Sequence, residues 1–233
     1  MRSIFGLLSL LVTLTLTLAA EPVRAISLTD LSNTDTATGL KEALATGSQV
    51  AVQKLGAENG FFSNDKVKIP LPEAMQKVDS LMRKFGMGKQ ADELLLRMNR
   101  AAEAAVPEAK ALLLNAVKQM SFKDAKGILT GGNDAATQYF KRATSEQMLV
   151  KFLPIVKKSM EKVKLAEVYN AYADQGAKFG LVKAEDTRIE DYIARKALDG
   201  LFTMIAEEEK AIRADPVGQA SNILKKVFGA LGK

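Results

Sequence analysis

The stretch ILTGGNDAATQYFKR, residues 128–142, constrains the fold more than any other part of the chain. Its two glycines, Gly131 and Gly132, can adopt positive φ and so end whatever helix precedes them. Asn133 and Asp134 are residue types that cap helix N-termini, so a new helix is predicted to follow directly. The pattern indicates a corner between two helices, and the free N–H groups behind it make a candidate site for an anion.

The N-terminus of the chain predicts export. Met-Arg-Ser is followed by a nearly uninterrupted apolar run over residues 4–18, and Val23-Arg24-Ala25 places small residues at positions −3 and −1 of a cleavage site. These features are typical of a secretory signal peptide. The apolar run is shorter than the roughly 20 residues that a membrane-spanning helix needs. We therefore predict a signal peptide over residues 1–25, cleaved at its end or alternatively near Ala20, rather than a transmembrane anchor.

The composition excludes several kinds of chemistry. The chain contains no cysteine, no histidine and no tryptophan. Without cysteine there are no disulfides, and no lipid anchor is expected because a bacterial lipoprotein needs a cysteine after its signal. Without histidine, Ser–His and Cys–His catalysis and histidine-based metal sites are excluded, so no metal and no cofactor are predicted. The net charge of +6 is spread along the chain without a dense basic stripe, so nucleic acid is not expected as a partner.

The remainder of the chain is predicted to be almost entirely helical. Residues 26–36 are predicted to form a flexible tether, and 37–233 a single compact all-α domain of about eight to ten short helices, since no linker or repeat divides it. The predicted helices cover 37–58, 73–85 with a break at Gly86, 90–106, 108–120, a short one capped by Ser121, 135–142, 145–164 capped by Thr144 with a kink near Val150, 165–179, one from the capping box at 187–190 to 213, and 217–228.

Residues 61–72 interrupt the helical pattern. Apolar and polar side chains alternate in the second half of this segment as in a strand, but its two prolines forbid a central strand. An extended arm lying over the helices is predicted, with Phe61, Phe62 and Ile69 covering the core. The alternative is a clamp over a partner, because loops often carry function.

A polar cluster is predicted where Asn99, Arg100 and Glu103 lie among alanines that allow a neighbouring helix to approach closely. Asn99 and Glu103 are four residues apart and therefore share one helix face. If that face points inwards, the cluster must be paired, because a buried unpaired polar group costs roughly 2–7 kcal/mol.

Glu208 and Glu209 border the apolar stripe of the helix that ends at 213, and one of them is predicted to face inwards. Basic residues that it would meet there are Arg100, Lys196 and Arg213. Two interpretations stay open: a structural ion-pair network, or a carboxylate pair of Glu103 with Glu208 or Glu209 for acid–base chemistry or divalent-cation binding.

Two further features have alternative interpretations. Tyr139, Phe140, Tyr169 and Tyr172 are predicted either to pack in the core or to line an aromatic pocket. The amphipathic helix predicted over 217–228, with its lysines, either docks on the domain or lies on an anionic membrane.

Several motifs together carry a family resemblance. They are KIPLP at 68–72, MNRAAE at 98–103, GGNDAATQYF at 131–140, ALDGLF at 197–202 and IAEEE at 205–209. In these motifs the chain resembles a bacterial family of exported proteins, the domain of unknown function 4197. The resemblance extends over nearly all of the chain after the signal and implies export and one helical domain. It implies no catalytic residue.

These features together predict a periplasmic, non-enzymatic binding or structural protein of the bacterial envelope. The alternative is a carboxylate-dependent hydrolase acting on envelope polymers through the glutamates named above. The candidate partners are an envelope component or an anionic membrane surface.

Overall fold

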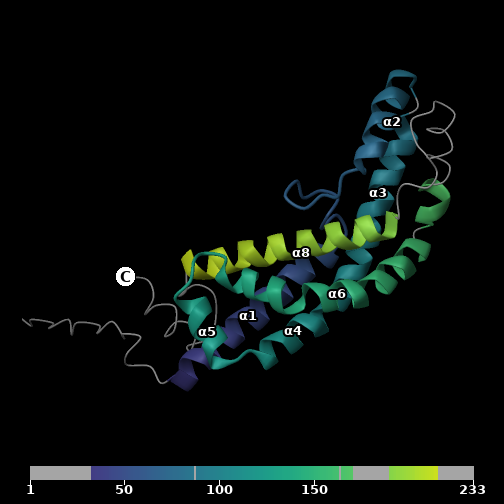
Figure 1. The fold of residues 1–233 in the computed structure, drawn as a ribbon. Coiled ribbons are helices and arrows are strands. Elements are labelled where there is room, and N and C mark those ends of the chain that lie inside the picture. Colours follow the sequence, from purple (N-terminus) through teal and green to yellow (C-terminus); the bar gives the residue numbers. More distant parts are fainter. Residues whose placement is uncertain (1–32, 87, 163, 170–188, 215–233) are drawn as a thin grey trace, which may run out of the picture.

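The computed structural model describes residues 33–86, 88–162, 164–169 and 189–214 (Figure 1). Within these ranges all regular structure is helical, which confirms the predicted all-α class. The elements are α1 (Asn33–Gly56), α2 (Glu73–Lys84), α3 (Gly88–Ala105), the 3₁₀ helix η2 (Val106–Glu108), α4 (Ala109–Gln119), α5 (Phe122–Leu129), α6 (Ala135–Lys162) and α8 (Ile189–Ala214). None of the described helices is both long and apolar enough to span a bilayer.

α8 is the helix around which the others assemble. It packs against α6, α1 and α3, and α1 packs in turn against α4 and α5. Figure 1 shows α5 at one end of the body and the α2–α3 hairpin projecting from the other. The buried residues of α8 follow the 3.6-residue period, as expected for a helix that presents a broad apolar face to several neighbours.

α6 has no single apolar face, because its buried residues fall at every fourth position from Ala136 to Met160. A spacing of four residues drifts by about 40° around the helix at each step. Successive turns therefore face different neighbours, and α6 contacts α3, α4, α5 and α8. Pro154 lies inside the helix, and Figure 1 shows α6 curving along its length, in keeping with the missing N–H at proline.

The prediction of two helices over 135–164, with Thr144 as the cap of the second, is wrong. One helix runs through this region as α6, and Thr144 lies buried in its interior. The Thr144 hydroxyl donates to the Phe140 carbonyl at 2.6 Å, one turn earlier. A threonine can make this bond inside a helix as well as cap a new one, so the local pattern alone does not distinguish the two.

The predicted cap of α5 is confirmed. Ser121 forms a capping box with Asp124: its hydroxyl accepts the Asp124 N–H, and the Asp124 carboxylate accepts the Ser121 N–H at 3.0 Å. The hydrogen bonds from Ser121 lower the pKa of Asp124. This interaction therefore stabilises the fold fully above the ordinary carboxyl pKa of about 4, and the contribution is lost as the pH falls through the lowered value.

Other boundaries shift by a few residues. α1 begins at Asn33, so the end of the predicted tether is helical. α3 begins at Gly88 rather than residue 90. Seven α-helices and one 3₁₀ helix lie complete in the described part, besides the helical residues 165–169, against about eight to ten helices predicted for the domain. The predicted signal peptide, most of the 165–179 helix, the capping box at 187 and the 217–228 helix lie outside the described residues.

The segment between α1 and α2 is irregular, but the prediction of an extended arm is wrong for its first part, because residues 57–67 form successive turns closed by backbone hydrogen bonds. The segment places an aromatic ring against α8. Phe61 and Ile69 are buried in the core and Phe62 is half-buried. A Cβ on Gly200 would lie 2.6 Å from Phe61 Cε1 and 3.2 Å from Val67 Cβ. The segment can approach α8 this closely because residue 200 has no side chain.

Replacing Gly200 by alanine is therefore expected to destabilise the protein by about 1–3 kcal/mol through overpacking, although alanine favours a helix. Gly127 is the matched control, because it lies in α5 and, apart from its own helix turn, no atom of the described residues lies within 4 Å of the Cβ position. Gly127→Ala should stabilise by about 0.5–1 kcal/mol. Urea unfolding measures both changes, and a Gly200→Ala variant as stable as the wild type would contradict this packing.

Candidate functional site

The predicted polar cluster on α3 holds the irregular segment that precedes α2. Asn99 is fully buried, and its side chain pairs with both backbone groups of one residue in that segment. The Ile69 N–H donates to Asn99 Oδ1 at 2.8 Å, and Asn99 Nδ2 donates to the Ile69 carbonyl at 3.0 Å. The same Nδ2 donates to the Leu95 carbonyl at 2.8 Å. The amide thus takes the place of a neighbouring strand for Ile69.

Glu103 likewise pairs with backbone groups, at the start of the segment. The N–H groups of Phe61 and Phe62 both donate to Glu103 Oε1, at 3.0 and 3.1 Å. Arg100 donates to Glu103 Oε2 at 2.5 Å. Arg100 also reaches the Asn59 side chain at 2.9 Å, so α3 holds the chain just after α1 ends. The buried carboxylate is consequently paired at both oxygens.

The segment is tied to α8 as well. Lys66 forms an ion pair with Glu207, and this hydrogen bond lowers the pKa of the Glu207 carboxyl. The Tyr192 hydroxyl donates to the Pro70 carbonyl at 3.0 Å, and burial raises the pKa of Tyr192. The segment therefore bridges α3 and α8 and contributes to the core, as predicted.

The helix N-terminus predicted to hold an anion holds the carboxylate of Glu209. The Ala136 N–H donates to Glu209 Oε1 at 2.9 Å, and the Thr137 N–H and hydroxyl each donate to Oε2 at 2.9 Å. Arg213, one turn later on α8, pairs with Oε1 at 2.8 Å and also donates to the Ile128 carbonyl at 2.9 Å. The first N–H groups of α6 thus find their anion within the same chain.

The prediction that Gly131 and Gly132 adopt positive φ at the corner before α6 is wrong. Neither Gly131 nor Gly132 has a positive φ. Residue 131 is a glycine because there is no room for a side chain: a Cβ on Gly131 would lie 2.6 Å from the Cβ of Ala135. Asp134 does not cap α6 through its own side chain but accepts a hydrogen bond from the Gln138 amide at 2.9 Å. Asn133 is exposed on the same corner.

Of the other predicted residues, Glu208 and Tyr139 are both partly buried. Glu208 pairs with Lys54 of α1 at 2.6 Å. The Tyr139 hydroxyl donates to the Ala116 carbonyl at 3.4 Å, and burial raises its pKa. Tyr139 stacks at a tilt on Phe140, with ring centroids 5.9 Å apart. Tyr169 packs partly buried against the core, while Tyr172 lies outside the described residues.

The structure does not bring the predicted carboxylate pair together. Glu103 lies on α3 and contacts the segment before α2, whereas Glu208 and Glu209 lie on α8 and contact α1 and α6 respectively. Within the described ranges, no three Asp or Glu side chains are grouped so as to hold a metal ion. The candidate glutamates thus lie in two separate buried clusters and in one ion pair with the exposed Lys54.

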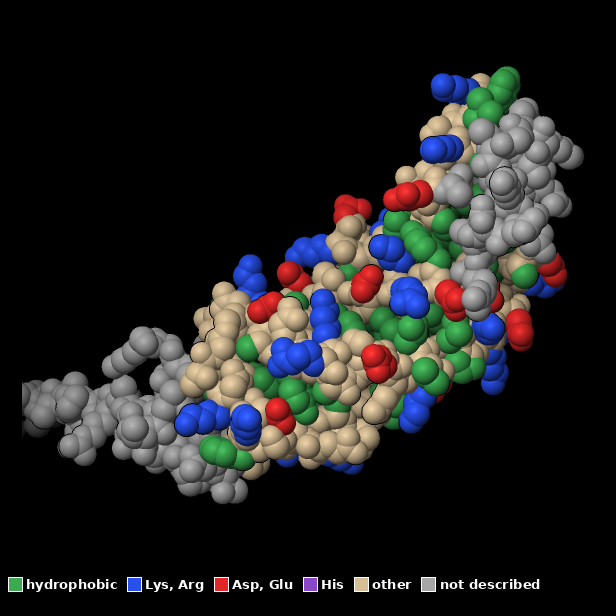
Figure 2. Space-filling model, in the orientation of Figure 1, with side chains coloured by type: hydrophobic (Ala, Val, Ile, Leu, Met, Phe, Trp, Pro, Cys, Tyr) green, Lys and Arg blue, Asp and Glu red, His purple; other side chains and the backbone are tan. Residues whose placement is uncertain are grey.

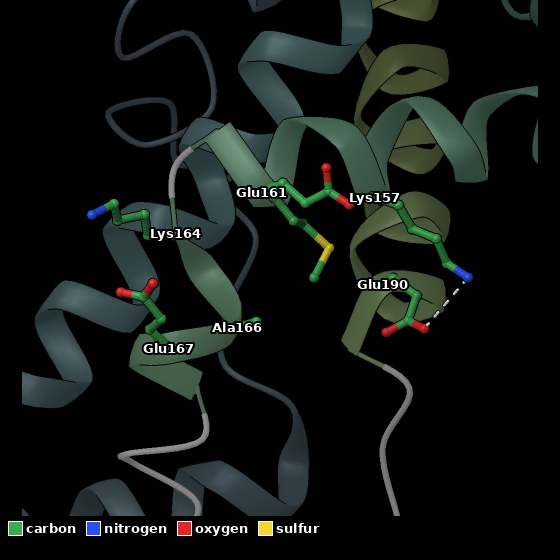
Figure 3. Close-up of a pocket in the computed structure, with 7 residues that line it drawn as sticks. Lys157, Glu161, Lys164, Ala166, Glu167 and Glu190 are labelled. Atoms are coloured by element: carbon green, nitrogen blue, oxygen red, sulfur yellow. Dashed lines mark ion pairs between the residues drawn. The ribbon is translucent and has the colours of Figure 1, made fainter.

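A hollow lies elsewhere, between the end of α6, the helical residues 165–169 and the start of α8. Its volume is about 510 Å³. Figure 3 shows Lys164 and Glu167 on one side and the Lys157–Glu190 pair, 3.8 Å apart, on the other. Mixed charges of this kind favour a polar partner over an apolar ligand. The sequence pattern did not single out these residues, because charged outer faces of helices are common.

A smaller groove of about 300 Å³ follows the seam between α6 and α8. Its floor is apolar, with Leu149, Leu198 and Phe202, and Lys141 lies over the Phe202 ring at 5.8 Å. Figure 2 shows hydrophobic side chains gathered along this seam between basic and acidic ones. Both hollows are open surface features, unlike the sealed clusters at Glu103 and Glu209.

Comparison with known families adds one finding. A family model described as "Protein of unknown function (DUF4197)" matches residues 30–229 of the chain. No curated protein and no solved structure matches it. The family match covers all described helices.

Replacing Asn99 by aspartate tests the role of the buried amide. The carboxylate keeps the shape but loses the donors to the Ile69 and Leu95 carbonyls, so a loss of about 3 kcal/mol is expected. Hydrogen exchange at the Ile69 amide should accelerate alongside the drop in unfolding free energy. Asn115→Asp, on the exposed side of α4, serves as the control and should change stability by at most about 0.5 kcal/mol. Equal effects at the two positions would contradict the assignment.

Replacing Glu209 by alanine should leave Arg213 and two N–H groups without their anion, at a cost of about 3–5 kcal/mol. Added formate or acetate should restore part of the lost stability by entering the vacated space. Glu208→Ala is the neighbouring control, because its partner Lys54 is exposed and such pairs contribute about 0–1 kcal/mol. Thermal unfolding with and without formate reads out both variants; a Glu209→Ala loss no larger than that of Glu208→Ala would rule out the role given to Glu209.

Proposed function

The chain belongs to the family described as protein of unknown function (DUF4197), and from that premise we propose that it is a non-enzymatic binding or structural protein exported to the bacterial periplasm. One observation carries the proposal: the buried polar side chains that the sequence offers for chemistry are bonded to backbone groups of their own chain. Asn99, Glu103 and Glu209 each hold N–H or C=O groups of a distant segment. The hydrogen-bonding capacity of these side chains is therefore used to hold the fold together.

The N-terminal leader supports the export part of the proposal. Residues 1–25 combine a basic start, a leucine-rich core and a small-residue exit. The family match begins at residue 30, just after the predicted cleavage point. A leader followed directly by the family domain is the order expected of an exported protein.

The bonding of the glutamates favours the non-enzymatic role over a hydrolase. A general acid or base must hold its proton at an oxygen that reaches the substrate. Both oxygens of Glu103 and of Glu209 accept hydrogen bonds from the chain, and Glu208 is paired with Lys54. A binding role instead places the contact surface on the exterior, where the mixed-charge cavity of Figure 3 lies.

Export is tested by producing the full chain in a bacterial host and fractionating the cells. We expect the periplasmic fraction to contain a product whose N-terminus is Ile26. Leu11→Arg, which places a charge in the apolar core of the leader, should leave an uncleaved product in the cytoplasm. An intact leader on wild-type protein in the cytoplasmic fraction would refute the proposed location.

The non-enzymatic part is tested separately with the purified mature chain. Incubation with isolated envelope polymers should release no fragments, and the Glu103→Gln variant should behave like the wild type. Fragment release by the wild type that is lost in a folded Glu103→Gln variant would establish the hydrolase instead.

A further inference from the structure

The outer side of α6 is a continuous row of exposed residues. The buried residues of this helix recur at every fourth position from Ala136 to Met160. The residues midway between them, which are also four apart, are all exposed from Gln138 to Lys162. Because an α-helix turns by about 100° per residue, a step of two residues moves a side chain by about 200°, to nearly the opposite side. This outer row therefore faces away from the core along the whole of α6.

Two apolar side chains lie in the middle of the outer row. Val150 is 76% exposed, more than any other large apolar side chain of the described residues. Pro154, one turn later in the same row, is exposed as well. Figure 1 shows this half of α6 at the outer edge of the body. Covering these side chains with an apolar phase is favourable, because apolar surface is then removed from water.

Lysines continue the row and flank it. Lys158 and Lys162 follow the apolar pair at the same spacing of four residues, and Lys151 lies beside Val150; all three are exposed. Among the described residues none of these lysines belongs to an ion pair. Residues 150–162 contain four lysines and one glutamate, Glu161, so their net charge is +3 (4 − 1). Figure 2 shows basic side chains beside hydrophobic ones along this edge.

We propose that this edge of α6, formed by Val150, Lys151, Pro154, Lys158 and Lys162, docks on an anionic lipid bilayer. The valine and the proline enter the boundary between headgroups and acyl chains, and the lysines contact the lipid phosphates. A bilayer fits the edge better than a soluble polyanion, because a polyanion pairs with the lysines but offers no apolar surface to Val150. The inference goes beyond the proposed function and does not depend on it, since anionic lipids attract these groups wherever the protein is located.

The chain has no tryptophan, which allows a direct test. Val150→Trp in the mature chain, residues 26–233, introduces a single tryptophan at the edge of α6. Vesicles containing half phosphatidylglycerol should shift its fluorescence emission to the blue, and vesicles of phosphatidylcholine alone should shift it far less. Phe122→Trp is the matched control, because Phe122 is 46% exposed and also precedes a lysine, but it lies on α5. The emission at position 122 should stay unchanged.

Vesicle sedimentation measures the strength of the contact. Val150→Ser should weaken binding to the anionic vesicles about fivefold. Lys158→Gln and Lys162→Gln should each weaken it about fivefold and reduce its dependence on salt. Lys123→Gln combined with Lys126→Gln, which removes two exposed lysines from α5, should bind like the wild type. The altered side chains are exposed, and circular dichroism checks that every variant is folded.

Three results would overturn the proposal. The first is a Trp emission at position 150 that anionic vesicles leave unchanged; if binding still depended on the lysines, the edge would be a site for polyanions and not for a bilayer. The second is an equal shift at position 122, which would mean adsorption without a site. The third is sedimentation of the wild type that persists undiminished in the Val150→Ser, Lys158→Gln and Lys162→Gln variants, which would place membrane binding elsewhere in the chain.

Discussion

The contact between the Glu209 carboxylate and the N-terminus of α6 is the interaction on which most of the architecture depends. The first N–H groups of a helix have no partner within it, and they carry partial positive charge that favours an anion. Glu209 supplies that anion from α8, and Arg213 neutralises it while binding the last turn of α5. One carboxylate thereby holds α5, α6 and α8 in register. The unpaired charge left by removing either partner is what makes the contact hard to replace.

Asn99 and Glu103 solve a related problem for the segment before α2. That segment enters the core without a helix or sheet to pair its backbone, and buried N–H and C=O groups must be paired. Side chains from α3 supply the pairing at Phe61 and at Ile69. The polar residues that look most suited to catalysis are therefore bonded to the backbone of their own chain. The hollow at the end of α6 and the groove between α6 and α8 are two open surfaces of the described residues.

Local signals predicted the elements well where a single residue pattern decides the outcome. The capping box at Ser121, the irregular segment before α2 and the break at Gly86 are each set by neighbours in sequence. Thr144 shows the limit of such signals, because its hydroxyl can cap a new helix or bond within one, and only the packing of α6 decides. The buried residues of α6 wind around the helix, and their positions can be explained only by the packing of α6 against α3, α4, α5 and α8.

The sequence by itself determined the helical class, most helix ends, the leader pattern and the exclusion of histidine and cysteine chemistry, because these follow from composition and from residues within one or two turns of each other. It also indicated that one of Glu208 and Glu209 faces inwards. Only the tertiary structure decided that Glu209 meets Thr137, 72 residues away, and that Asn99 meets Ile69, 30 residues away. Contacts over such separations depend on how whole helices pack, and no local pattern records which N–H group a buried carboxylate will find.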